Sequence, residues 1–257
     1  MRKALIIISF LIVGSAYCLA GVEFVAQTRS DGGGDVTVHA YVSGARAKVV
    51  FVESAADLYN IGDYMLSRDE GKTLYLVSPN TKTYTKYDVQ SMMAGMGGMV
   101  QGMRGMMKVS FEAPRVEKLM QEDGGLIAGL PTQHYRYRTS YTVSMHLTGA
   151  KKVSTVIEED IWTTDKLVDP ALKVWLKQDP PPTGDEQVDK MIRAEMSKVE
   201  GFPLKRVTVT RTSDAAGEHS SQSEMDVLEV KRVTVPPATF AIPRGYREVA
   251  PKRGLED

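Results

Sequence analysis

The chain has 257 residues, one cysteine, and 32 basic residues balanced by 32 acidic ones. A single cysteine excludes an intramolecular disulfide, so an ordinary hydrophobic core has to stabilise the fold. The balanced charge gives no support for a protein that binds nucleic acid or an anionic membrane surface.

The N-terminus has the pattern of an export signal. Arg2 and Lys3 precede an apolar run over residues 4–13, and small residues follow at 14–16 and 20. This order is typical of secretory signal peptides, and the run is shorter than the about 20 apolar residues that span a bilayer. We expect residues 1–20 to be a cleaved signal peptide, with a periplasmic protein and no membrane span after its removal.

Two cleavage sites stay open, one after Ala16 and one after Ala20. A lipoprotein signal places a small residue directly before the lipidated cysteine, but Tyr17 precedes Cys18, so a lipid-anchored form is disfavoured. Residues 21–257 are expected to form a single β domain, because no linker-like segment divides them.

Six short segments rich in Val, Thr and Tyr come next, with turn-forming clusters between them. They recur about every ten residues, which is typical of an antiparallel sheet or barrel. The alternation is clear where Val36, Val38, Ala40 and Val42 share one face. The predicted strands are 22–27, 36–42, 46–53, 64–68, 73–77 and 83–88.

A Met/Gly-rich insertion at 91–108 then interrupts the strands. Its main methionines fall at intervals of four and three residues, which places them on one face of a helix. Each of the five glycines costs about 1 kcal/mol relative to alanine in a helix, roughly 5 kcal/mol in total. We therefore expect a mobile segment that becomes ordered only when its methionine face is buried. These methionines are Met92, Met96, Met99, Met103 and Met106.

A second set of strands follows. Residues 133–147 alternate over an unusual length, with Tyr135 and Tyr137 on one face and Arg136 and Arg138 on the other. Fifteen residues would span about 50 Å, so this strand has to bend strongly or break in two. Three segments within 109–130 fit short strands or loop. Further strands are predicted at 153–163, 204–212, 224–235 and 239–242.

Two helices are expected between these strands. Asp169 and Pro170 suit the first turn of one helix. Thr183 and Glu186 have capping-box spacing for the second, whose apolar stripe is interrupted by Glu195.

The chain carries no common catalytic or nucleotide-binding motif, neither a Gly-x-Ser-x-Gly elbow, nor a His-Glu-x-x-His helix, nor a phosphate-binding loop. Arg136, Arg138 and the acidic run 158–160 are interpreted as solvated or edge-protecting faces. The histidines lack metal-ligand spacing and are interpreted as surface residues. We therefore expect a protein that is not an enzyme and uses no cofactor. The histidines are His39, His134, His146 and His219.

The order of elements resembles a known group of proteins. A signal peptide leads into a β-meander, a helical excursion interrupts it, more strands follow, and the chain ends on Thr239-Phe-Ala-Ile-Pro-Arg-Gly-Tyr246. Over about residues 22–250 the chain is similar to the periplasmic lipoprotein-carrier (LolA/LolB-like) superfamily, closest to its uncharacterised domain-of-unknown-function members. Further points of contact are 41–49, 73–84, 129–135, 159–163 with its Trp162, and 201–204.

The resemblance implies a mainly β, α+β fold. It would be an antiparallel half-open β-barrel wrapped over helices, with an apolar cavity between them that holds acyl chains in that superfamily. No lipid-binding residue of those carriers matches a position here, so none is carried over. The chain departs from the carriers in its Met/Gly-rich insertion and in its greater length.

Three interpretations of the insertion stay open. It is a flexible surface segment without a specific role, or a lid in which the five helical-face methionines cover a ligand, because pliable thioethers adapt to varied apolar groups. The third interpretation is copper binding, since thioethers select Cu(I) and Met93, Met96 and Met99 have Met-x-x-Met spacing.

The leading hypothesis is a non-enzymatic periplasmic binding or carrier protein. It would hold a lipid, a lipoprotein acyl chain or another apolar ligand in the concave face of the half-barrel. The alternatives are soft-metal binding by the methionine segment and a structural envelope protein whose sheet docks a partner protein.

Overall fold

The computed structural model describes residues 19–31, 33–54, 59–107, 109–145, 151–167, 180–198 and 200–251. Most of the expected signal peptide, the helix expected from Asp169, and His146 lie outside these ranges. Within them the chain forms one sheet, two helices and a short 3-10 turn.

Six strands make the first half of the sheet, and all six predicted segments are confirmed to within three residues at each end. Residues with positive φ close the tight connections between them, such as Gly44 at φ 58°. The strands are β1 (Leu19–Ser30), β2 (Val36–Ser43), β3 (Arg46–Ser54), β4 (Tyr64–Ser67), β5 (Thr73–Ser78) and β6 (Thr83–Asp88).

Helix α1 (Val89–Met107) joins the two halves of the sheet. In the second half, the long alternating stretch is a single strand of 16 residues that does not break in two. The neighbouring strand along it carries two register shifts, which bend such a pair. The remaining elements are β7 (Ser110–Phe111), β8 (Arg115–Ile127), β9 (Leu130–Met145), β10 (Lys151–Thr164), α3 (Glu186–Met196), β11 (Phe202–Asp214), β12 (Gly217–Val235), η1 (Pro237–Phe240) and β13 (Arg247–Val249).

Two local predictions are wrong. The strand predicted at 239–242 is replaced by η1, because Pro237 lacks an N–H and fixes a φ that suits the first residue of a helical turn. The N-cap of α3 is Asp185 rather than Thr183, since the Asp185 carboxylate accepts the N–H groups of Gln187 and Val188.

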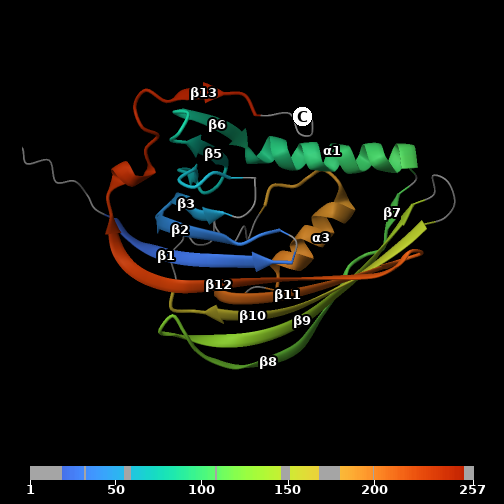
Figure 1. Cartoon of the computed structure of the whole chain (residues 1–257). Coiled ribbons are helices and arrows are strands. Elements are labelled where there is room, and N and C mark those ends of the chain that lie inside the picture. The colour runs from blue at the N-terminus through green and yellow to red at the C-terminus, as the bar shows by residue number, and fades with distance from the viewer. Residues whose placement is uncertain are drawn as a thin grey trace, which may run out of the picture.

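The strands form one curled, half-open sheet (Figure 1). Their order is β13-β6-β5-β4-β3-β2-β1-β12-β11-β10-β9-β7, with β8 also paired to β9. Neighbours are antiparallel except that β13 runs parallel to β6. The two halves curve toward each other, α3 lies between them, and α1 runs across the open side (Figure 1). The predicted fold class, an antiparallel half-open barrel wrapped over helices, is confirmed.

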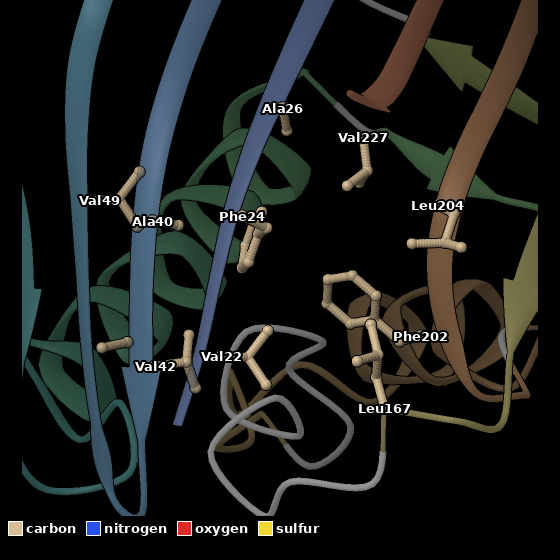
Figure 2. Close-up of a cluster of buried hydrophobic side chains, with 11 residues drawn as sticks. Val22, Phe24, Ala26, Ala40, Val42, Val49, Leu167, Phe202, Leu204 and Val227 are labelled. Atoms are coloured by element: carbon tan, nitrogen blue, oxygen red, sulfur yellow. The ribbon is translucent and has the colours of Figure 1, made fainter. Parts of the chain in front are cut away.

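The main hydrophobic core lies on the concave face of this sheet. Period-two alternation turns every second residue of β1 and β2 inward, where they meet the start of β11 and Leu167 (Figure 2). Phe24 and Phe202 pack edge to face there, with ring centroids 5.4 Å apart. A second cluster, around Tyr64, Leu66 and Phe240, packs η1 against the other face of β3–β5.

Candidate functional site

The concave face begins as a continuous apolar wall. It contains buried apolar side chains from five strands, together with Leu167 from the segment after β10. Figure 2 shows the groups from β1–β3 and those from β11–β12 facing the same interior space. The wall consists of Val22, Phe24, Ala26, Ala40, Val42, Ala47, Val49, Leu167, Phe202, Leu204 and Val227.

The same face becomes polar along β11. Residues at alternate positions share one face of a strand. Arg206, two residues after Leu204 in β11, therefore lies on the same concave face as the wall. The guanidinium of Arg206 lies 3.9 Å from the Glu159 carboxylate of β10. Its Nε and the hydroxyl of Thr139 are buried, and neither has a hydrogen-bond partner in the described part of the chain.

Lys198, two residues after the end of α3, anchors this helix to the polar part of the face. Its fully buried ammonium donates to Glu159 and, at 2.7 Å, to Glu195. Glu159 is therefore part of a buried ion pair, whereas its neighbours in the acidic run point to the opposite face. Because breaking a buried pair leaves an uncompensated charge, this contact holds the C-terminal end of α3 in place.

Tyr135 and Tyr137 line the face beside Glu159. Burial raises the pKa of both phenols, and the nearby Glu200 carboxylate adds to the rise. The ammonium of Lys118 lies 5.2 and 5.9 Å from the two ring centroids. Both phenols therefore stay protonated and neutral at physiological pH.

Helix α1 turns the methionines of the insertion in two directions. Its buried face contains Gly97 and Val100, and Met93, Met96 and Met103 are half-buried beside them. Met92, Met99 and Met106 are 51%, 61% and 78% exposed. Of the five predicted cover residues, two lie against the molecule and three face outward.

Polar contacts hold α1 to the start of α3. Arg104, the one charged residue of α1, donates to both carboxylate oxygens of Asp185 at 2.5 and 3.2 Å and to Gln187 at 2.7 Å. Gln101 donates to the carbonyl of Gly184 at 3.1 Å. Asp185 thus caps α3 and pairs with Arg104 through the same carboxylate.

Gly97 allows the two segments to meet at the backbone. A Cβ at this position would lie 2.1 Å from the carbonyl oxygen of Thr183. The other helix glycines, Gly95, Gly98, Gly102 and Gly105, would place a Cβ in open space. Close approach therefore explains one of the five glycines of the insertion.

The two helices cover the concave face lightly. None of the described side chains of α3 is fully buried, and its apolar residues Val188, Met191 and Ile192 are half-exposed. A hollow of about 260 Å³ opens at one end of the wall, where Val22 and Leu167 meet Arg232. The cover is held mainly by polar contacts at the ends of α3.

The convex face carries paired charges. Arg138 and Arg211 both donate to Glu158 at 2.8–3.1 Å, and Arg136 donates to Asp160 at 2.9 Å. These pairs agree with the interpretation of Arg136 and Arg138 as part of a solvated outer face.

His134 is not the surface residue that was predicted. It stacks on Trp162 with ring centroids 4.0 Å apart and lies between Asp160 at 2.7 Å and Glu122 at 3.3 Å. Gly124 lets the chain approach this ring pair closely, because a Cβ at position 124 would lie 2.7 Å from Trp162. His39 is half-buried and contacts Glu23 at 2.6 Å, and His219 is exposed.

Across the described residues, no three His, Cys, Asp or Glu side chains are grouped to hold a metal ion. None of the helices in these ranges is long and apolar enough to cross a membrane.

Comparison with known proteins gives a family. The crystal structure of a LolA-superfamily protein from Nitrosomonas europaea is similar over 87% of this chain and 90% of that chain, with 11% sequence identity and a TM-score of 0.28. No curated protein sequence matches the chain. The family model of a domain of unknown function, DUF4412, matches residues 52–246, which are 195 of the 257 residues. The chain therefore belongs to the DUF4412 family, in agreement with the resemblance to domain-of-unknown-function members that the sequence predicted.

Proposed function

We propose that this protein is a non-enzymatic periplasmic binding or carrier protein. It holds a lipid, a lipoprotein acyl chain or another apolar ligand against the concave face of its half-barrel. The observation that carries the proposal is the continuous apolar wall under a cover that α1 and α3 pack only lightly. The likeness of the sequence to lipoprotein carriers supports the same class of ligand.

The light packing of the cover makes ligand entry feasible. Buried apolar surface stabilises by about 25 cal/mol per Å², so half-exposed helices are held less strongly than core strands. The hollow of about 260 Å³ is smaller than the roughly 300–1,000 Å³ of ordinary ligand sites. An acyl chain therefore needs α1 and α3 to move outward, and its apolar surface then replaces their contacts with the wall.

Met96 and Met103 are the methionines best placed to touch such a ligand. They flank the buried Val100 on the side of α1 that faces the molecule. Unbranched thioethers adapt their shape to different apolar groups, which suits a cover that closes over varied chains. The outward Met92, Met99 and Met106 have no part in this contact.

Native mass spectrometry tests the proposal on protein purified from the bacterial envelope. We expect bound mass that organic solvent removes, and renewed binding when oleic acid is added to the stripped protein. A ligand-free mass together with no binding of oleic acid would contradict the proposal.

A matched pair of double variants locates the contact. Replacing Met96 and Met103 by Gln should weaken oleic acid binding, because it places polar amides against the chain. Replacing Met92 and Met106 by Gln makes the same chemical change on the outer side and should leave binding unchanged. Equal effects of the two pairs would refute a role for the inner face of α1.

The paired charges on the convex face of β9–β11 give the partner-docking alternative no comparable support.

A further inference from the structure

Arg206 is a cation without a hydrogen bond at the edge of the apolar wall. Its closest acidic contact is the Glu159 carboxylate at 3.9 Å, which is beyond hydrogen-bond range, and its buried Nε has no partner among the described residues. The arginines of the convex face, by contrast, each donate to a carboxylate at 2.8–3.1 Å. Because a buried N–H donor without a partner costs free energy, Arg206 needs an acceptor that the described chain does not supply.

Apolar groups of the proposed ligand site lie directly beside this guanidinium. Arg206 follows Leu204 of the wall on the same face of β11. It also pairs across the sheet with Met225, which packs against the wall. The side chain of Arg206 is 37% exposed, whereas that of Lys198, the other cation beside Glu159, is 1% exposed. A ligand whose chain lies on the wall can therefore bring a polar end group to Arg206.

Tyr135 places a neutral hydroxyl at the same end of the concave face. Tyr135 and Arg206 pair with Ile161 from opposite sides, so their Cα atoms are about 10 Å apart. Both side chains are long enough to reach one group that lies above Ile161. Because burial raises the pKa of the Tyr135 phenol, its hydroxyl is protonated and can donate a hydrogen bond.

The acidic groups at this end of the face have other cations as their closest partners. Glu159 accepts a hydrogen bond from Lys198, which also donates to Glu195 at 2.7 Å. The carboxylate of Glu200 lies 3.7 Å from the ammonium of Lys118. The negative charges near the guanidinium are therefore compensated without it, and its own positive charge is left available to a ligand.

We propose that Arg206 binds the anionic head group of the ligand, a carboxylate or a phosphate, while the acyl chain of the same molecule lies on the apolar wall. A guanidinium recognises both of these groups through paired, charge-assisted hydrogen bonds. Tyr135 donates a further hydrogen bond to the head group. This inference rests on the proposed function and narrows its ligand to an anionic amphiphile.

Competition between lipids with the same chain tests the charge of the head group. The delipidated mature protein is mixed at about pH 8, where a carboxylic acid is ionised, with equal amounts of oleic acid and oleyl alcohol. A second mixture contains oleoyl lysophosphatidic acid and mono-oleoylglycerol, which differ by one phosphate. Free lipid is removed by gel filtration, and the retained lipids are extracted and quantified.

The parent protein should retain the anionic lipid over the neutral one about tenfold or more in at least one mixture, the effect of a charge-assisted hydrogen bond. The mixture with the larger preference identifies the head group as carboxylate or phosphate. Equal retention in both mixtures would overturn the role of Arg206 and leave the proposed carrier function standing. Retention of none of the four lipids would contradict the carrier function as well.

Single variants assign the preference to one side chain. Arg206→Gln removes the charge and should bring the retained amounts of anionic and neutral lipid close to equal. Arg211→Gln is the matched control on the convex face of the same strand, where the guanidinium donates to Glu158 at 2.9 Å, and it should keep the preference of the parent. Circular dichroism checks that both variants are folded, and Arg206→Lys, which keeps the charge but loses the paired hydrogen bonds, should show a reduced preference. An unchanged preference in Arg206→Gln, or an equal loss in Arg211→Gln, would refute the assignment.

Discussion

Two adjacent glycines of α1, Gly97 and Gly98, differ in how much space surrounds them. Gly97 touches the backbone at Thr183, whereas the position of Gly98, one residue later, is open. Gly97→Ala forces backbone segments apart and should destabilise the fold by about 1–3 kcal/mol. Gly98→Ala adds helix propensity without a clash and should stabilise it by up to about 1 kcal/mol. Urea unfolding of both variants measures the difference, and equal effects would contradict the close approach of α1 to Thr183.

The convex face provides a test by pH. Hydrogen bonds from Arg211 and Arg138 lower the pKa of Glu158 below its ordinary value of 4.5. Because the pKa is lower in the folded state, the stabilisation is present above pH 4.5 and is lost as the pH falls through the folded pKa. Glu158→Gln should therefore reduce stability by about 0.2–1 kcal/mol at neutral pH and make little difference in strong acid.

Thermal unfolding of the parent and Glu158→Gln at pH 7 and at pH values below 4.5 checks this expectation. A difference between the two proteins that grows as the pH falls would contradict it. Glu186→Gln on the surface of α3 is a suitable comparison, because Glu186 is exposed and its hydrogen bond with Lys190 in the same helix lowers the pKa of Glu186.

Sequence periodicity predicts the methionine face of α1 but not which part of it is buried. That choice depends on contacts such as Arg104 with Asp185, which are 81 residues apart. The sequence holds one sign of the buried side, because Arg104 is the one charged residue in an otherwise neutral segment and needs an acidic partner. The burial of Glu159 cannot be predicted from the acidic run 158–160 either, because it depends on the ion pair with Lys198, which is distant in the sequence.

Among the elements, strands were predicted best, because alternating side chains and turn residues are local signals. The first six strands agree closely with the structure. The helical turn at Pro237 and the N-cap at Asp185 are not predicted from the sequence. At the cap, both Thr183 and Asp185 have side chains that can accept a backbone N–H, and the sequence does not indicate which of them does so.

The contacts of the first strand lead to a prediction about where the export signal expected from the sequence would be cleaved. Leu19 and Ala20 pair with Val235 and Thr234, and the buried Ser43 hydroxyl donates to the Ala20 carbonyl at 3.2 Å. Cleavage after Ala20 would remove these contacts and place a charged amino group on the buried Gly21.

Cleavage after Ala16 keeps the whole of β1, so the mature protein is expected to begin at Tyr17. The intact mass of protein exported by a bacterial host, together with sequencing of its first residues, measures this directly. A mature chain that begins at Gly21 would show that β1 does not need its first two residues.

The whole molecule combines a firmly paired sheet with a weakly packed cover. Twelve of the thirteen strands in the described ranges lie on one continuous path, and an apolar wall lines its concave face. The helices over this wall are joined to each other through Arg104 and Asp185 and to the sheet through Lys198 and Glu159. Such a cover can separate from the wall while the sheet stays intact.

Photo-crosslinking shows directly whether an apolar ligand lies between the concave wall and the helices. The delipidated protein would be incubated with a fatty acid that carries a diazirine near the end of its chain, irradiated, digested and mapped by mass spectrometry. Labels are expected on the inward residues of β1, β2 and β11 and on Met96 or Met103. Labels confined to the convex face, or labelling that excess oleic acid does not reduce, would contradict it.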